Sequence, residues 1–288
     1  MTARISSEPD RELQPQPLRF LGPERDAVFF GTAQSPRVYE WMLGGCENYE
    51  ADRDLAHALL EVADWVKTSA QLNRDFQVRS YTWCREQGVR QYLELGCGYP
   101  HHPVLYDVLG RQCRVVYVDR DPGVLAHART DLDQDHDTTV VGADVLAMDE
   151  LLNSDALRQA IDPSQPVAVF LGDVLPWCPD DSAVDRAMAA LRSWMPPGSF
   201  LVLTHFTDEF TPGQAAAVAA TYAAHGVQVR PRSREQIAAL FGDFVHQGPG
   251  LCATGQWHRG SPQARRPPEG SAAFAGIAMK PTAQGRNA

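Results

Sequence analysis

The sequence predicts an α/β fold built on a mostly parallel sheet whose strands are joined by helices. From Gln91 onward, short runs of β-branched and aromatic residues alternate with helix-length amphipathic segments, which is the pattern of βαβ units. Before Gln91, apolar residues recur at helical spacing instead. With 288 residues, 44% of them hydrophobic, the chain can also bury a large core.

The first part of the chain divides into a polar arm and a helical region. Residues 1–35 are polar and rich in proline, so we expect a flexible arm there. Residues 36–88 form the helical region, in which the pair Gly44-Gly45 separates the first two helices. Residues 89–280 should form the sheet domain, and residues 281–288 a disordered tail.

Five strands are predicted in the first part of the sheet domain. They are the tracts YLELG, VVYVD, TVVGAD, VAVFLGD and FLVLTHF. Helices are expected near 212–225 and 234–241, followed by two strand-like tracts, LCATGQW and FAGIAMK. The segment between those two tracts is rich in Pro, Gly and Arg, which is typical of a long hairpin loop. The sheet should therefore have seven strands and end in an antiparallel hairpin.

Composition argues against several classes of protein. The net charge is -10, with 36 acidic and 26 basic residues, which disfavours nucleic acid as a partner. No apolar run reaches the roughly 18 residues of a membrane span, and the N-terminal segment lacks the apolar core of a signal peptide. Six cysteines without CxxC pairs suit reduced thiols. We therefore expect a cytoplasmic protein with no membrane partner. Its oligomeric state is left open, with a homodimer as one arrangement.

The turn after the first predicted strand has features of a nucleotide-binding loop. It reads ELGCG, in which Gly96 and Gly98 allow a ligand to approach the backbone. Asp119 ends the next strand, where an acid can accept both hydrogen bonds of a ribose diol. A dinucleotide site needs a third glycine, but His101 stands at that position. The carboxylate of Glu94 would also repel a diphosphate.

Acids follow three successive strands, which favours a ligand that carries positive charge and no phosphate. Asp144 follows the third strand, where it could accept a hydrogen bond from an adenine amino group beside the apolar Val145. S-adenosylmethionine has an ammonium and a sulfonium group and no phosphate, so it matches this pattern. Cys97, His101 and His102 could instead suggest a metal site. Adjacent histidines diverge at a helix start, however, and no second cluster supplies partners, so no metal is expected.

Motifs one to three of the class I S-adenosylmethionine-dependent methyltransferases resemble the tracts YLELGCGYP, VVYVDRDPGVLAHAR and VVGADV. The chain is also similar to an actinobacterial S-adenosyl methyltransferase family that was first catalogued as a domain of unknown function. The residues that carry this similarity are RVYEWMLGGCENYEADRD, followed by LNRDF. The chain departs from that family at Cys46, Glu47 and His101-His102. The resemblance implies a Rossmann-like class I methyltransferase fold, a lid formed by residues 36–88, S-adenosylmethionine as cofactor and S-adenosylhomocysteine as product.

The resemblance also implies roles for individual residues. Glu94 should lie near the methionine amino group, Asp119 should hold the ribose with Asp121 at its edge, and Asp144 and Val145 should flank the adenine. The full set of expected cofactor contacts is Arg37, Tyr39, Met42, Gly44, Glu94, Gly96, Gly98, Asp119, Asp121, Asp144, Val145, Gly172 and Asp173.

Methyl transfer from a sulfonium is an in-line displacement, so positioning the acceptor and excluding water can supply most of the rate. A hydroxyl or N–H acceptor is helped by a general base, for which the candidates are His101, His102, Asp173 and His205. An electron-rich carbon acceptor would mainly need aromatic packing. The residues expected to contact the acceptor are Tyr39, Trp41, Asn48, Tyr49, Trp177, His205 and Phe206.

The sequence therefore predicts a methyltransferase that acts on a small molecule, which we expect to be a specialised metabolite of natural product biosynthesis. The preferred chemistry is C-methylation of an electron-rich aromatic or indole-like acceptor, with O- or N-methylation as alternatives. A non-catalytic S-adenosylmethionine-binding regulatory protein is a second hypothesis. A nicotinamide-dependent oxidoreductase is a third, which the missing third glycine and Glu94 disfavour.

Overall fold

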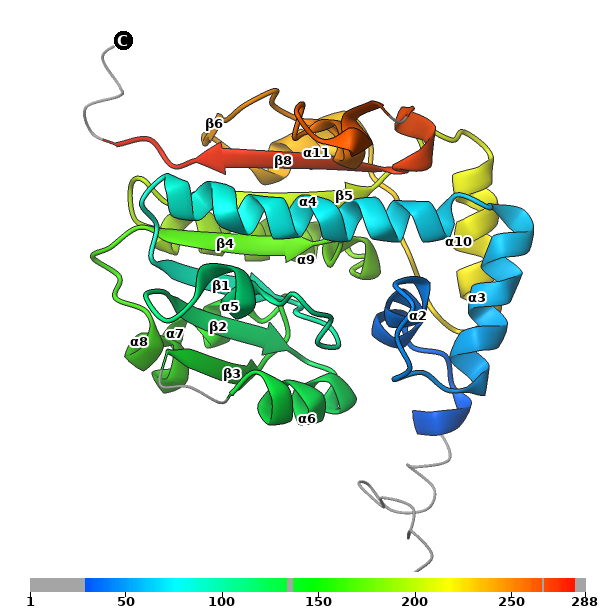
Figure 1. The fold of residues 1–288 in the computed structure, drawn as a ribbon, viewed down its shortest axis with the longest axis horizontal. Helices are drawn as coiled ribbons and strands as arrows, with labels where there is room; N and C mark the ends of the chain where they lie inside the picture. Colours follow the sequence, from blue (N-terminus) through cyan, green and yellow to red (C-terminus); the bar gives the residue numbers. More distant parts are fainter. Residues whose placement is uncertain (1–28, 134–136, 266, 283–288) are drawn as a thin grey trace, which may run out of the picture.

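The computed structural model describes residues 29–133, 137–265 and 267–282. Its centre is an eight-stranded sheet in the order β3-β2-β1-β4-β5-β8-β6, with β7 paired to β8 (Figure 1). The strands β1 to β5 run parallel, and β8 lies antiparallel to β5. The predicted α/β class with a mostly parallel sheet is confirmed. The strands are β1 (Gln91–Leu95), β2 (Arg114–Asp119), β3 (Thr138–Gly142), β4 (Val167–Gly172), β5 (Phe200–Phe206), β6 (Val245–His246), β7 (Cys252–Ala253) and β8 (Ala273–Met279).

Helices cover both faces of this sheet (Figure 1). Those that pack along one face are α4 (Val66–Glu86), α5 (Leu105–Leu109) and α6 (Pro122–Asp131). Those on the opposite face are α7 (Met148–Asn153), α8 (Asp155–Ala160), α9 (Asp181–Trp194) and α11 (Arg234–Leu240). Short 3-10 helices η1 (Leu175–Trp177), η2 (Thr254–Gln256), η3 (Pro262–Arg265) and η4 (Pro268–Gly270) lie in the connections.

The central strands are buried on both faces, which is why they read as continuous apolar runs in the sequence. Successive residues of β4 point to opposite faces: Val169 packs with the α9 side of the core, and Phe170 packs with Phe76 of α4. This alternation fixes the register of the strands. In that register Asp119 lies opposite Gly142, and Gly172 lies opposite Thr204. The carboxyl ends of β2 to β5 therefore meet at one edge of the sheet.

The N-terminal helices stand at that edge (Figure 1). α2 (Ser35–Met42) and α3 (Glu50–Val62) pack on each other, and both contact α4. α3 also contacts α10 (Gln214–Ala224). The break between α2 and α3 contains the predicted Gly44-Gly45 pair. The helical region predicted over 36–88 is thus divided, because α4 belongs to the layer that covers the sheet. We call residues 35–62 the lid.

The C-terminal part of the sheet differs from the prediction. β6 adds an eighth strand that the sequence pattern did not indicate. The tract LCATGQW was expected to be one strand, but only its Cys252–Ala253 pair is extended. η2 then turns the chain so that Trp257 is buried against Phe76, and this packing outweighs continued strand pairing. The predicted hairpin is present, since β7 pairs antiparallel with β8. The expected arm (1–35) and tail (281–288) lie mostly outside the described residues.

Candidate active site

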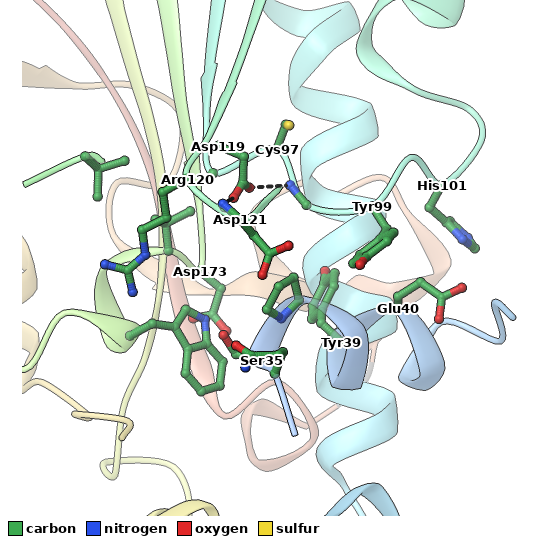
Figure 2. Close-up of a pocket in the computed structure, with 18 of the residues that line it drawn as sticks. Ser35, Tyr39, Glu40, Cys97, Tyr99, His101, Asp119, Arg120, Asp121 and Asp173 are labelled. Carbon is green, nitrogen blue, oxygen red and sulfur yellow. Dashed lines mark hydrogen bonds between the residues drawn. The ribbon is translucent and has the colours of Figure 1, made fainter. Parts of the chain in front are cut away.

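A cavity of about 390 Å³ lies at the carboxyl ends of β1 to β4, beside the lid (Figure 2). Its walls come from α2, α4, the loops that follow the four strands, and η1. The expected cofactor contacts that line it are Tyr39, Gly96, Gly98, Asp119, Asp121, Val145, Gly172 and Asp173. The structure therefore brings together eight residues that are far apart in the sequence.

The glycines of the ELGCG turn have different reasons to be glycine. Both adopt left-handed backbone angles, with φ of +68° at Gly96 and +65° at Gly98. A Cβ atom at Gly98 would meet nothing within 4 Å, so this position keeps open space in the cavity wall. A Cβ atom at Gly96 would lie 2.5 Å from Cγ2 of Val174. Gly98 therefore leaves room for a ligand, whereas Gly96 is needed for packing against the loop after β4.

Asp119 is held at the end of β2 by the backbone around it. Its Oδ2 accepts from the Gly98 N–H at 3.0 Å, and its Oδ1 accepts from the Asp121 N–H at 2.9 Å (Figure 2). Burial raises the pKa of Asp119, while these backbone N–H groups act in the opposite direction. A carboxylate oxygen has further acceptor capacity, so Asp119 can also bind hydroxyl groups in the cavity. Asp121 caps α6 through the N–H groups of Gly123 and Val124, which is a structural role as well.

The end of β3 supplies an apolar wall rather than an acid. Ala143 and Val145 line the cavity, but Asp144 does not. Asp144 forms an ion pair at 2.9 Å with Arg120, a residue of the loop after β2, and accepts from the N–H of Leu146. Asp144 is thus engaged by Arg120 beside the cavity, and its contact with an adenine stays a prediction. Arg120 itself lines the cavity.

Glu94 lies behind the wall of the larger cavity. It is buried and accepts a hydrogen bond of 2.7 Å from the Tyr81 hydroxyl, and it does not line the cavity. Burial raises its pKa, against the lowering effects of Arg74 and Tyr81. The cavity wall at this end is formed by Arg74 and Gln77 of α4. The contact of Glu94 with the methionine amino group stays a prediction.

A second cavity of about 70 Å³ adjoins the first. Tyr39, Asp173 and Trp177 line both cavities. The second cavity is further walled by aromatic rings and a methionine, contributed by the lid, the turn before α4, β5 and α10, namely Met42, Trp65, Phe206 and Tyr222. Of the expected acceptor contacts, Tyr39, Trp177 and Phe206 lie here, and so does Met42, which was expected to contact the cofactor.

Asp173 stands at the junction of the two cavities. Its backbone has a φ of 57°, which is uncommon for a residue other than glycine and is often found at functional sites. Its Oδ1 accepts from the Phe206 N–H at 2.9 Å. Burial raises the pKa of Asp173 to about 7. The carboxyl group at this junction can therefore hold or release a proton near neutral pH.

Tyr39 is positioned by a chain of hydrogen bonds that reaches the sheet. The Thr204 hydroxyl of β5 donates to Asn73 Oδ1 at 2.7 Å, and Asn73 Nδ2 donates to the Tyr39 hydroxyl at 3.0 Å. Tyr39 in turn donates to the Ala70 carbonyl at 3.3 Å. Burial raises the pKa of Tyr39 well above its ordinary value, so the phenol stays protonated. These hydrogen bonds connect α2 of the lid with α4 and β5.

The three candidate histidines have separate environments. His101 lines the larger cavity, and its pKa is lowered first by burial and then by Arg74. His102 is mostly exposed, and its Nδ1 lies 2.6 Å from Asp107 Oδ2 at the start of α5. His205 is fully buried, and its Nε2 accepts from Arg232 at 2.8 Å. Burial lowers the pKa of His205 to about 3. His102 and His205 line neither cavity, so their predicted catalytic positions, and the acceptor contact of His205, are not supported.

Several expected ligand contacts instead hold the lid together. Arg37 is fully buried, and its Nε donates to Asp52 at 2.7 Å. Asn48 donates to Glu40 Oε2 at 2.9 Å, and a Cβ atom at Gly45 would collide with the same Glu40 side chain. These contacts fix the loop between α2 and α3. The other expected contacts that line neither cavity are Trp41, Gly44 and Tyr49.

Sequence reasoning missed the polar residues of α4. Asn73 and Gln77 are both buried, and they lie four residues apart on the face that points toward the strand ends. Helical periodicity identifies only apolar neighbours such as Phe76, and it says nothing about the polar residues between them. Buried polar side chains spaced by one helical turn are a signal that could have located this wall.

In the part of the chain that the structure describes, no group of three or more His, Cys, Asp and Glu side chains is arranged to hold a metal ion. Within the same ranges, no helix combines the length and apolarity that crossing a bilayer requires.

The sheet order, the glycine turn and the acid at the end of β2 define a Rossmann-like domain of the class I methyltransferase type. The chain belongs to the S-adenosyl methyltransferase family, whose sequence pattern matches residues 23–281. It is therefore an S-adenosylmethionine-dependent methyltransferase, and its cofactor is S-adenosylmethionine.

Two solved structures are similar over most of their length. A candidate methyltransferase from Thermobifida fusca YX is 34% identical, with 89% of this chain and 98% of that chain covered and a TM-score of 0.83. A DUF574 family protein from Streptomyces avermitilis MA-4680 is 29% identical, with 88% of this chain and all of that chain covered and a TM-score of 0.83. No protein with a curated description matches the sequence.

The residues of the larger cavity fit this cofactor. Its volume of about 390 Å³ lies within the range of small-molecule sites. The open face of Gly98 and the anchored carboxylate of Asp119 suit a ribose, and Ala143 and Val145 offer an apolar surface for an adenine ring. When bound, S-adenosylmethionine supplies a methyl group on a positively charged sulfur.

Proposed function

We propose that the protein methylates a small, electron-rich aromatic molecule that binds in the second cavity. The observation that carries this proposal is the junction of the two cavities at Asp173. On one side lies the wall that fits the cofactor, and on the other a small space surrounded by Trp65, Trp177, Phe206 and Tyr222. Flat aromatic walls suit a flat acceptor, because offset or edge-to-face ring contacts add to the burial of apolar surface.

The residues at the junction have complementary tasks. Tyr39 and Trp177 form the shared wall, so they orient the acceptor toward the larger cavity. The lid and α10 close the aromatic side and exclude water from the reacting groups. Asp173 accepts the proton that the acceptor loses, since its pKa of about 7 lies close to neutral pH.

The same arrangement supports a preference for the acceptor atom. A ring carbon of an electron-rich aromatic or indole-like compound is our preferred site, because the second cavity offers mainly apolar packing and one proton acceptor. A phenolic oxygen or an aromatic nitrogen would deliver its proton to Asp173 in the same way. We infer that the natural acceptor is a specialised metabolite rather than a macromolecule, in keeping with the small size of the cavity.

The test uses methyl-labelled S-adenosylmethionine and a panel of phenols, indoles and anilines, with aliphatic amines, protein and RNA as comparison acceptors. We expect label in an aromatic compound, and NMR of the product identifies the methylated atom. Transfer confined to aliphatic or macromolecular acceptors would overturn the proposal.

Two half-buried tryptophans of the N-terminal region provide a matched pair of variants. Trp65 lines the second cavity, whereas Trp41 lines neither cavity and packs against His57. Trp65→Leu should raise the KM for the acceptor at least tenfold and change the affinity for S-adenosylhomocysteine less than twofold. Trp41→Leu should change neither. Equal effects of the two substitutions on the acceptor KM would show that the second cavity does not bind the acceptor.

A further inference from the structure

Arg74 of α4 is a cation in the wall of the larger cavity, and no carboxylate of the described residues contacts it directly. Its Nη2 donates to the carbonyl oxygens of His101 at 2.6 Å and Pro103 at 2.5 Å. Its Nη1 makes only long contacts, to Gln77 Oε1 at 3.4 Å and the Tyr81 hydroxyl at 3.3 Å. Its Nε is buried without a hydrogen-bond partner among the described residues. All the acceptors around this guanidinium are neutral.

The other arginine in the cavity wall differs from Arg74, because it has a directly bonded anionic partner. Arg120 also lines the cavity, but Asp144 balances it in an ion pair of 2.9 Å. No carboxylate of the described residues lies within 4.0 Å of Arg74. Glu94 lies behind Tyr81, which donates to it, and attracts Arg74 through space without a direct contact. The Nη1 group of Arg74 is bonded only weakly within the protein, so an anion that enters the cavity can accept from it.

The order of the strands shows which part of the cofactor would reach Arg74. Along the sheet the order is β3, β2, β1, β4. The apolar wall for adenine follows β3 and the ribose-binding Asp119 ends β2, so the amino-acid end of the cofactor must extend past β1 toward β4. α4 crosses the sheet there. A Cβ atom at Gly172, the last residue of β4, would lie 1.8 Å from Gln77 Nε2, and Arg74 precedes Gln77 by one helical turn.

We propose that Arg74 binds the carboxylate of the methionine moiety of S-adenosylmethionine. The carboxylate would give the guanidinium a directly bonded anion, and it can accept from Nη1, whose contacts within the protein are long. The bonds to His101 and Pro103 hold the guanidinium in place before the ligand arrives. The proposal rests on the cofactor and is independent of which acceptor is methylated.

The test compares two ligands that differ only in this carboxylate, S-adenosylhomocysteine and its decarboxylated analogue. Isothermal titration calorimetry of the unaltered protein should show that S-adenosylhomocysteine binds about 10- to 150-fold more tightly, the range expected for charge-assisted hydrogen bonds. Arg74→Met should remove this preference and leave the affinity for the decarboxylated analogue within about threefold. The lack of a preference in the unaltered protein, or an equal loss for both ligands in Arg74→Met, would overturn the proposal.

Arg85 provides the matched control. It lies on the same helix and donates to the carbonyl of Val108 at 3.0 Å, but it does not line the cavity. Arg85→Met should therefore leave both affinities unchanged, and a lost preference in this variant would also count against the proposal. If Arg74→Met fails to fold, Arg74→Lys takes its place. It retains the charge without the planar fork, so it should bind S-adenosylhomocysteine more weakly while keeping part of the preference. A full preference in Arg74→Lys, with unchanged affinity, would contradict a specific role for the guanidinium.

Discussion

Replacing Asp173 by asparagine should make the protein more stable at alkaline pH and nearly inactive. Asparagine tolerates the left-handed backbone at this position, and its side-chain oxygen can still accept from the Phe206 N–H. The substitution therefore removes the negative charge while changing little else. Its effect isolates the cost of keeping a carboxylate at the junction of the two cavities.

The magnitude follows from the raised pKa of Asp173. Burial moves it from 3.8 to about 7, and each pKa unit corresponds to about 1.4 kcal/mol. The full difference is about 4 kcal/mol, but Asp173 borders both cavities, where solvent can screen the charge, so we expect about 2 kcal/mol. Because the folded-state pKa is the higher one, the associated stability is complete below pH 3.8 and is lost as the pH rises through 7.

Urea unfolding of both proteins at pH 5 and pH 8.5 measures this effect. The free energy of unfolding of Asp173→Asn should exceed that of the unaltered protein by about 2 kcal/mol at pH 8.5, and the difference should shrink toward pH 5. The kcat should fall about 10²- to 10⁴-fold, as expected when a general base is lost. The kcat of the unaltered enzyme should rise with pH through about 7. A less stable variant at pH 8.5, or a variant with full activity, would refute the reasoning.

Three further substitutions test other parts of the structure. Asp119→Ala should weaken S-adenosylhomocysteine binding about 100-fold in calorimetry, because two hydrogen bonds to a charged group are lost, and unchanged affinity would exclude the ribose contact. Arg37→Met leaves Asp52 buried without its partner and should lower the free energy of unfolding in urea by about 3 to 5 kcal/mol. A loss below about 1 kcal/mol would contradict that role. His102→Ala removes only an exposed pair with Asp107, so the stability should change by less than about 0.5 kcal/mol. A tenfold fall in kcat of this variant would return His102 to the list of catalytic candidates.

Much of the fold could be predicted because its signals are local. The parallel strands are buried on both faces, so they appear as apolar runs separated by amphipathic helices. Gly98 and Asp119 were also predictable, because a glycine turn and an acid at the end of the next strand have a fixed spacing in such sheets. The short strand β6 has only two residues and depends on pairing with β8, which leaves no pattern in the sequence.

Three predicted ligand contacts that line neither cavity have a partner from a distant segment. Asp144 is drawn to Arg120 of another loop, and Glu94 is covered by Tyr81 of α4. His205 accepts a hydrogen bond from Arg232, which follows α10 in the sequence. A strand-end position alone predicts proximity to the cavity, but it does not predict which neighbour the side chain will meet. These partners depend on tertiary packing, and nothing in the local pattern encodes it.

The most direct test of the account is a crystal structure of the protein with S-adenosylhomocysteine. We expect the adenine against Val145, the ribose hydroxyls on Asp119, the carboxylate on Arg74 and the sulfur near Asp173, facing the second cavity. A ligand that lies in the reverse direction, with its adenine beside α4, or one whose sulfur is remote from Asp173, would contradict the account.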